Sequence, residues 1–216
     1  MNKNMGKNRW YVRIEDYNKF IEECGEMKKY LRVYNKEDII LFRSRSKDYK
    51  ILSNFHVSST PLPFQGKEFT SVEQMLFYRI VNEYVDMTSL KDRKEEICNL
   101  IMSQKTGREV KVNKEIRAFD DQIDEEVEAK IGKMNWSLIR WQIAYQNIKI
   151  KLEYCKEFRE MLEANYGKYF CEDSHWGDWR AGVLLCIDET SEYYGKYIGC
   201  NYTGRAIQRA LVERNC

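Results

Sequence analysis

The strongest constraint on the fold of this chain is an apolar stripe in its last third. Between residues 137 and 165, apolar side chains recur at alternating spacings of three and four, which is the repeat of one face of an α-helix. Gly167 then marks the end of the pattern. The stripe predicts one long helix that acts as a scaffold for the core. Its members are Leu138, Trp141, Tyr145, Ile148, Leu152, Cys155, Phe158 and Leu162.

Shorter patterns predict the remaining structure as several helices and a few short strands. Both prolines lie in a Pro-Leu-Pro stretch, so we expect residues 58–66 to form a turn region. The fold class is therefore α+β, mainly α-helical. We expect residues 41–216 to form one domain and residues 1–40 to form an N-terminal extension, a strand plus a helix, that packs on it. The expected helices cover residues 17–34, 70–84, 89–104, 120–130 and 206–214, and the expected strands cover 10–14, 38–42, 169–171 and 183–187.

The composition is that of a folded, near-neutral protein. Hydrophobic residues make up 43% and aromatic residues 13% of the 216 positions, which excludes a disordered chain. The formal net charge is +2, so the chain is not a generally basic nucleic-acid binder, although the balance leaves room for a local basic patch.

The cysteine and histidine counts argue against a metal site. There are seven cysteines, none in a Cys-x-x-Cys pair, and two histidines, whereas a zinc site needs about four clustered ligands. We expect no metal and no cofactor. The absence of a signal peptide and of a long apolar run favours a cytoplasmic protein without membrane insertion. Five cysteines have apolar neighbours and are expected to be buried thiols: Cys24, Cys98, Cys155, Cys171 and Cys186.

Glu73 is the first candidate for chemistry. The sequence Thr70-Ser71-Val72-Glu73 fits a capping box, in which Glu73 would fold back onto the amide of the capping residue. The segment also follows a proline-rich loop and precedes an apolar turn. A carboxylate at a helix start between apolar walls can have its basicity changed by burial and by the helix dipole. The capping and catalytic roles can coexist.

Two further segments combine glycine with polar or aromatic side chains. His175-Trp176-Gly177-Asp178-Trp179 fits either a turn that Asp178 caps or a pocket wall in which an indole faces a planar base. His175 by itself is more often a surface histidine than a catalyst. Gly199-Cys200-Asn201-Tyr202-Thr203-Gly204 precedes a helix, whose first amides and Arg205 could face an anion.

The remaining candidates lie earlier in the chain. Ser53-Asn54-Phe55 and Phe42-Arg43-Ser44 offer amide and guanidinium groups that suit ribose or phosphate. Asn54 also fits a turn residue, and Arg43 also fits a surface charge. Trp136, which precedes the apolar stripe, is by itself more typical of a core contact than of a binding site.

Taken in order, these segments resemble the NADAR (YbiA-like) family. The matching elements are Phe42, Ser53-Asn54-Phe55, Gly66-Lys67, Ser71-Val72-Glu73-Gln74, Asn135-Trp136, Trp176-Gly177-Asp178 and the run from Gly199 to Gly204. The resemblance covers residues 41–216. The chain departs from the family where Gln74 replaces the usual histidine, and in the longer segment from Tyr84 to Met134. The chain is identified as a divergent member with a NADAR-like single domain.

The resemblance implies hydrolysis of an N-glycosidic bond to ribose. The leading expectation is removal of ADP-ribose from ADP-ribosylated guanine in DNA, which would oppose a counterpart ADP-ribosyltransferase. One alternative is an N-glycosidase of ribosylated riboflavin-pathway intermediates, and another is a non-catalytic module that binds ADP-ribose or NAD. The expected catalytic residues are Glu73 and Asp178. The expected substrate-binding residues are Phe42, Arg43, Ser53, Asn54, Phe55, Trp136, Trp176, Gly177, Gly199, Asn201 and Gly204.

Overall fold

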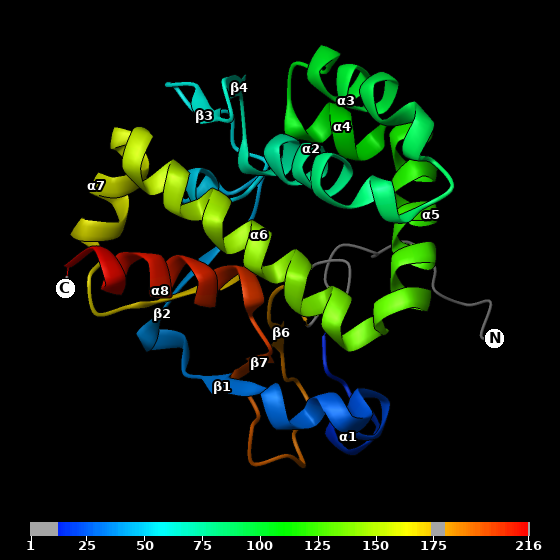
Figure 1. The fold of residues 1–216 in the computed structure, drawn as a ribbon. Coiled ribbons are helices and arrows are strands. Elements are labelled where there is room, and N and C mark those ends of the chain that lie inside the picture. The colour runs from blue at the N-terminus through cyan, green and yellow to red at the C-terminus, as the bar shows by residue number, and fades with distance from the viewer. Residues whose placement is uncertain (1–12, 174–179, 216) are drawn as a thin grey trace.

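The computed structural model describes residues 13–173 and 180–215 and confirms a mainly helical α+β fold (Figure 1). Helices α2 to α6 form most of the upper half, and α8 lies along α6. The α-helices are α1 (Tyr17–Cys24), α2 (Val72–Tyr84), α3 (Lys94–Ser103), α4 (Gly107–Val112), α5 (Lys114–Ile131), α6 (Lys133–Tyr154), α7 (Lys156–Ala164) and α8 (Tyr202–Asn215).

The strands of the described residues form three small sheets. Strands β1 (Arg32–Tyr34), β7 (Tyr197–Gly199) and β6 (Leu184–Leu185) form an antiparallel sheet in the order β1-β7-β6. Strand β2 (Ile39–Phe42) pairs in parallel with β5 (Tyr169–Glu172), with Phe42 opposite Glu172. Strands β3 (Leu62–Phe64) and β4 (Lys67–Phe69) form a hairpin. The β1–β7 and β2–β5 pairings join segments far apart in sequence.

The long helix expected from the apolar stripe is two helices, α6 and α7. Cys155 separates them with an extended backbone (φ −98°, ψ 100°), although no proline or glycine marks this position. The start of the stripe was also wrong, because Leu138 is 57% exposed. The later members from Tyr145 to Leu162 are buried in the main core as expected.

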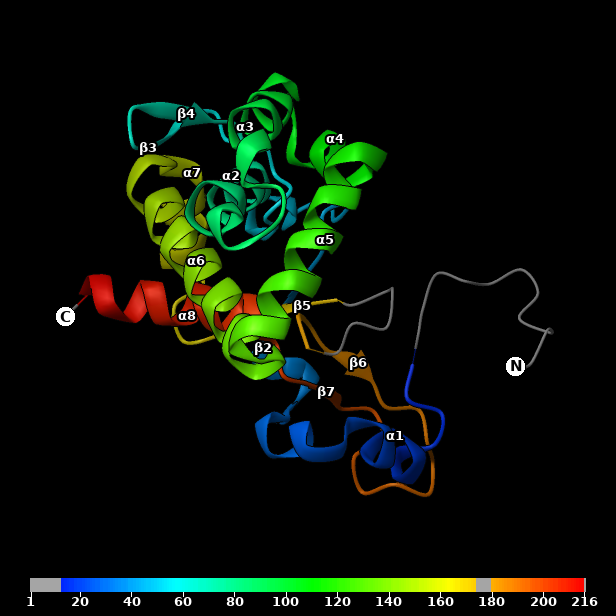
Figure 2. The ribbon, with the colours of Figure 1, turned by 45° about the vertical axis from the view of Figure 1, so that its right-hand side comes forward.

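The segment from residue 13 to residue 34 is built into a small lobe with strands β6 and β7. The expected helix over 17–34 ends at Cys24, and a 3-10 helix over 25–30 leads into β1. Figure 2 shows this lobe, with α1, β6 and β7, below the main helices. Its apolar cluster takes residues from both ends of the chain: Ile14, Phe20, Cys24, Leu184, Cys186 and Ile198.

Four other elements differ from the sequence prediction. The turn region expected over 58–66 contains β3, which pairs with β4 across a tight turn at Gln65 and Gly66, both of which have positive φ (47° and 74°). The helix expected over 89–104 is the shorter α3, which begins at Lys94 and ends at Ser103, and Gly107 begins α4. The acidic helix expected over 120–130 is the second half of α5, and β7 was not predicted.

Close packing joins the start of α8 to β5. Gly204 lies so near the strand that an added Cβ would come within 1.8 Å of the Phe170 carbonyl oxygen. The buried Asn201, which has a positive φ of 50°, donates from Nδ2 to the same carbonyl at 2.9 Å. Its Oδ1 accepts the amide of Glu172 at 3.3 Å. Asn201 and Gly204 therefore fix the last helix to the strand.

Candidate functional site

The N-terminal cap of α2 leaves the Glu73 carboxylate free of any capping role. Ser71, not Thr70, is the capping residue, and its Oγ accepts the amide of Gln74 at 3.2 Å. Gln74 stands three positions after the cap and its Oε1 accepts the Thr70 amide at 2.9 Å. The capping box predicted for Glu73 was thus displaced by one residue. Glu73 instead projects from the neighbouring position on the helix.

Gln74 also connects α2 to the end of α3. Its Nε2 donates to the carbonyl oxygens of Ile101 at 3.3 Å and Gln104 at 2.8 Å. The side chain that replaces the histidine of the resembled family is therefore engaged at both of its polar atoms. Its role in this structure is to hold two helices together.

Glu73 is a nearly buried acid with charged side chains around it. Its residue is 7% exposed, and within the described part of the chain no hydrogen bond to its carboxylate is found. Burial raises the pKa of the Glu73 carboxyl, and the nearby Asp120 raises it further, whereas the charges of Lys111 and Arg140 lower it. The group is therefore a carboxyl whose protonation state responds to three other helices, α4, α5 and α6.

Gly107 allows α4 to approach the start of α2. A Cβ at this position would lie 2.5 Å from the Ser71 Oγ and 2.8 Å from the Glu73 Cβ. Farther along α4, the Lys111 ammonium lies 5.1 Å from the centre of the Phe77 ring, one turn beyond Glu73 on α2. No sequence motif indicated this contact, because it depends on the packing of two helices.

A network of α5 and α6 residues positions Arg140. Its Nη1 donates to Asp120 Oδ1 at 3.0 Å and also to Asp124 Oδ1. The indole of Trp136 donates to the same Asp124 oxygen at 2.7 Å. Trp136 is 1% exposed, so the structure places it in the core, where its indole has no open face for stacking on a ligand. Trp136 and Arg140 share Asp124 as a hydrogen-bond acceptor, and the charge of Arg140 lowers the pKa of Glu73.

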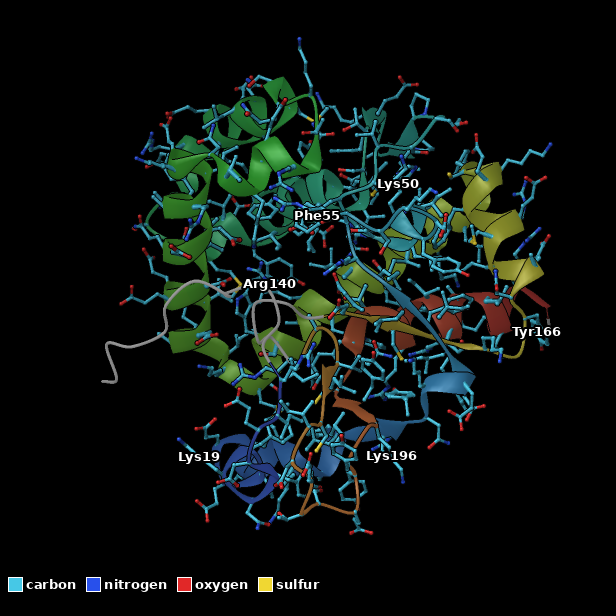
Figure 3. All side chains as sticks on the ribbon, turned by 180° about the vertical axis from the view of Figure 1, so that it is seen from behind. Lys19, Lys50, Phe55, Arg140, Tyr166 and Lys196 are labelled. Atoms are coloured by element: carbon cyan, nitrogen blue, oxygen red, sulfur yellow. The ribbon has the colours of Figure 1, made fainter. Side chains whose placement is uncertain are left out.

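The Ser53-Asn54-Phe55 segment meets Glu73 through the backbone. The Asn54 carbonyl accepts the Glu73 amide at 3.0 Å, which satisfies one of the free amides at the start of α2. The buried Ser53 Oγ accepts the Phe55 amide at 3.2 Å and so shapes the turn. Figure 3 shows Phe55 and Arg140 in the middle of the molecule, away from Lys19 and Lys196 in the small lobe. Two of the predicted motifs are therefore in contact through a backbone hydrogen bond.

Lys151 is a buried cation that fixes this segment from α6. It is 1% exposed, and its Nζ donates to the carbonyl oxygens of Ile51 at 2.6 Å and Ser53 at 3.0 Å. Burial lowers the pKa of the Lys151 amine to about 7. Burial, together with the charge of Lys151, also lowers the pKa of His56 to about 4. No sequence motif pointed to Lys151, because a lysine within an apolar stripe is usually exposed.

Phe42 and Arg43 lie at the end of the β2–β5 pair. Phe42 is fully buried in the core, which leaves it no surface for a ligand. Arg43 Nη1 lies 3.4 Å from Asp173 Oδ2, at the point where β5 has ended. Asn201 reaches the same strand end through the Glu172 amide. Arg43 and Asn201 therefore meet at the end of β5, and these contacts do not involve Glu73.

Three of the amides expected to face an anion at the start of α8 are engaged within the chain. The amides of Asn201, Tyr202 and Thr203 donate to the carbonyls of residues 182, 180 and 181 at 3.0–3.1 Å. These amides are therefore already satisfied by the chain. Asn201 and Gly204 serve the contact with β5, and Gly199 pairs with Arg32 in the small sheet.

The remaining predicted site residues, Trp176, Gly177 and Asp178, lie outside the described residues, as does His175. Among residues 13–173 and 180–215, no group of three or more side chains could hold a metal ion. In the same ranges, no helix has the length and apolar character needed to cross a membrane. The six described cysteines, the five expected ones and Cys200, are buried and unpaired.

Comparison with known proteins leaves the resemblance as a prediction. No protein-family model matches the chain, and a search of characterised proteins finds no match. What the geometry supplies is a nearly buried carboxyl on α2, fastened through its amide to the Asn54 turn and approached by charges from three helices. Such a group can accept or donate a proton, or stabilise a nearby positive charge.

Proposed function

We propose that the protein is a hydrolase that cleaves an N-glycosidic bond to ribose, and that it removes ADP-ribose from ADP-ribosylated guanine in DNA. The observation that carries the proposal is the environment of Glu73. Its carboxyl is not used in the helix cap, has a pKa raised by burial, and lies beside the motif segment that contains Asn54. Perturbed carboxyls of this kind are typical of catalytic positions.

The reaction adds water across the bond between the ribose C1′ and a nitrogen of the base. As the C–N bond breaks, positive charge develops on the sugar ring, as in other glycoside cleavages. The Glu73 carboxylate would stabilise that charge and accept a proton from the attacking water. The oxygen of the water ends on C1′, and the leaving nitrogen takes up a proton. The products are free ADP-ribose and the restored base.

The charged neighbours of Glu73 tune this chemistry. The charges of Lys111 and Arg140 lower the pKa of its carboxyl and so oppose the effect of burial. Arg140 is itself held by Asp120 and Asp124, so its position is fixed before a substrate arrives. The resemblance adds Asp178 as an orienting group for the ribose. A counterpart ADP-ribosyltransferase would supply the modified guanine, and the buried free thiols suit a cytoplasmic setting.

Incubation with a guanine-ADP-ribosylated DNA oligonucleotide tests the proposal. We expect release of free ADP-ribose, and we expect Glu73→Gln to reduce the rate by about 10² to 10⁴-fold while ADP-ribose still binds. Glu68→Gln is the matched control, because Glu68 is an exposed glutamate on β4. A Glu73→Gln variant with the wild-type rate would contradict the assigned role.

The same assay separates the two other functions that the resemblance implies. Hydrolysis of a ribosylated riboflavin-pathway intermediate but not of the DNA substrate would identify an N-glycosidase of small molecules. Binding of ADP-ribose or NAD by calorimetry, without turnover of either substrate, would identify a binding module. In the second case Glu73→Gln has no rate to reduce.

A further inference from the structure

Five cations lie along the segment that runs from just before α4 to the start of α5, and α4 packs against the start of α2 near Glu73. Lysine or arginine occupies every third position from residue 105 to residue 117, and each of the five is exposed. Figure 2 shows α4 on the outer side of the helical half, next to α5. We call this set the basic strip. It consists of Lys105, Arg108, Lys111, Lys114 and Arg117.

The basic strip is not neutralised by neighbouring carboxylates. Within the described residues, none of its five side chains forms an ion pair, although many exposed cations elsewhere in the chain do. The two acids in the same stretch are engaged differently. Glu109 Oε2 accepts the backbone amide of Lys105 at 2.7 Å, and Glu115 lies 3.9 Å from Arg93. The strip is therefore a local positive surface on a chain that is nearly neutral as a whole.

The basic strip borders the candidate catalytic carboxyl. Gly107 lies within it and packs directly against Ser71 and the Cβ of Glu73. Lys111 lies over Phe77, one helical turn from Glu73 on α2. A ligand that lay along the strip would thus pass next to Glu73.

We propose that the basic strip binds the sugar-phosphate backbone of a single DNA strand and so presents one of its nucleotides to Glu73. This inference rests on the proposed function, because it names the polymer that carries the ribosylated base. A free dinucleotide has only two phosphates and could not engage five cations spread along α4, which alone is about 9 Å long, and into α5. A strand carries one phosphate per nucleotide at intervals that such a row can follow. Because Glu73 is nearly buried, the reacting nucleotide must be unpaired to reach it.

Binding of an unmodified, fluorescently labelled single-stranded oligonucleotide, measured by anisotropy, tests this proposal without any turnover. The test variant combines Lys105→Gln, Lys114→Gln and Arg117→Gln, and keeps Lys111 so that the charge beside Glu73 is unchanged. We expect about tenfold weaker binding or more, and a salt dependence reduced by about two in the slope of log K against log salt.

The matched control removes the same charge from another part of the surface. It combines Lys19→Gln, Lys28→Gln and Lys29→Gln, three exposed lysines in the small lobe. We expect this variant to bind as the wild type does, with equal thermal unfolding of both variants showing that they are folded. Equal weakening in the two triple variants would overturn the proposal, because it would reflect net charge alone.

Two further outcomes would also overturn it. One is a wild-type protein that does not bind the oligonucleotide. The other is a wild-type protein that binds poly-glutamate or anionic vesicles at least as tightly as DNA, which would assign the strip to an acidic protein or a membrane surface. Failure of the proposed function is seen separately. In that case the oligonucleotide binds through the strip, but no ADP-ribose is released from the modified substrate.

Discussion

Glu73 is a carboxyl whose charged form is disfavoured by burial in the protein. It is nearly buried, and within the described residues its carboxylate has no hydrogen-bond donor to replace water. Proteins that retain such a destabilising group commonly need it for activity. Lys111 and Arg140 offset part of this cost through their charges. The energetic cost of Glu73 can therefore be measured apart from any reaction.

Replacing Glu73 with glutamine should make the protein more stable. Because burial raises the pKa of the folded carboxyl, the folded state holds its proton over a range in which the unfolded state has lost it. The free energy of unfolding therefore falls as the pH rises above the pKa of this carboxyl in the unfolded state. A glutamine side chain stays neutral and avoids that loss. We expect a gain of about 1 kcal/mol at neutral pH, or about 2–4 °C in the unfolding temperature.

Thermal unfolding at several pH values checks this expectation. The difference between Glu73→Gln and wild type should be small near pH 4 and grow as the pH rises, whereas Glu68→Gln should show no such trend. A Glu73→Gln protein that is less stable than wild type at every pH would show that the carboxylate is favourably solvated in the fold.

His56 should titrate far below the usual range of histidine. Burial and the charge of Lys151 lower its pKa to about 4, so between this value and about 6.5 only the unfolded state holds the extra proton. Stability should therefore fall as the pH drops through this interval. Proton NMR of the imidazole signals gives the pKa directly, because the chain has two histidines and His56→Gln assigns the signal. A His56 pKa near 6.5 would contradict the half-buried placement of this side chain beside Lys151.

Residue patterns located Glu73 but not its contacts. The sequence placed a cap and an acid at the start of a helix, and both are present. The sequence allows either Thr70 or Ser71 as the capping residue. Because the structure uses Ser71, the residue three positions later that serves the cap is Gln74 and not Glu73. Lys151 had no local signal, since its partners, the carbonyls of Ile51 and Ser53, lie about 100 positions earlier in the chain.

The junction between α8 and β5 depends on a glycine that lies against a strand. Gly204→Ala would place a methyl group 1.8 Å from the Phe170 carbonyl oxygen, so the helix or the strand must move. The shift would also disturb Asn201, whose two hydrogen bonds to β5 are buried. We expect a loss of about 1–3 kcal/mol or more in the free energy of unfolding.

Denaturant unfolding of Gly204→Ala measures that loss. Thr203→Ala is a suitable control, because it changes the preceding residue of the same turn without adding atoms. A Gly204→Ala protein with wild-type stability would mean that the helix can move away from β5 at no cost, and would remove the structural account of this motif.

The helices and strands were predictable where the sequence pattern is local. The starts of α2 and β2 and the pairing partner β5 follow from capping and apolar runs, and the structure has them close to the expected positions. The break at Cys155 carries no glycine or proline, so the continuous stripe concealed two helices. The motif around Asn201 suggested a ligand site because its true partner, β5, is about 30 positions earlier.

The two ends of the described chain hold each other in place. Strand β1 pairs with β7, and Ile14 forms a bridge with Cys186. The apolar cluster of the small lobe draws equally on both segments. The residues before β2 therefore behave as part of the fold rather than as an appended piece, although the main helical core is separate from this cluster.

Deletion of residues 1–35 should destabilise the protein rather than remove an independent unit. It would expose Leu184, Cys186 and Ile198 and leave β7 paired on one side only, with β6. We expect a loss of about 3 kcal/mol or more in unfolding free energy, and a tendency to aggregate. Calorimetry and light scattering check both effects. An unchanged unfolding temperature would show that the small lobe does not contribute to the stability of the rest of the protein.

The parallel pairing of β2 with β5 also sets an order of events for a chain leaving the ribosome. Ile39 can find Tyr169 only after some 130 further residues have been made, and β1 must wait for β7 even longer. Helices α2 to α5 have local partners and can assemble first. Until β5 and β7 have been synthesised, β1 and β2 would remain unpaired and prone to aggregation. We expect chaperones to be needed most during this period.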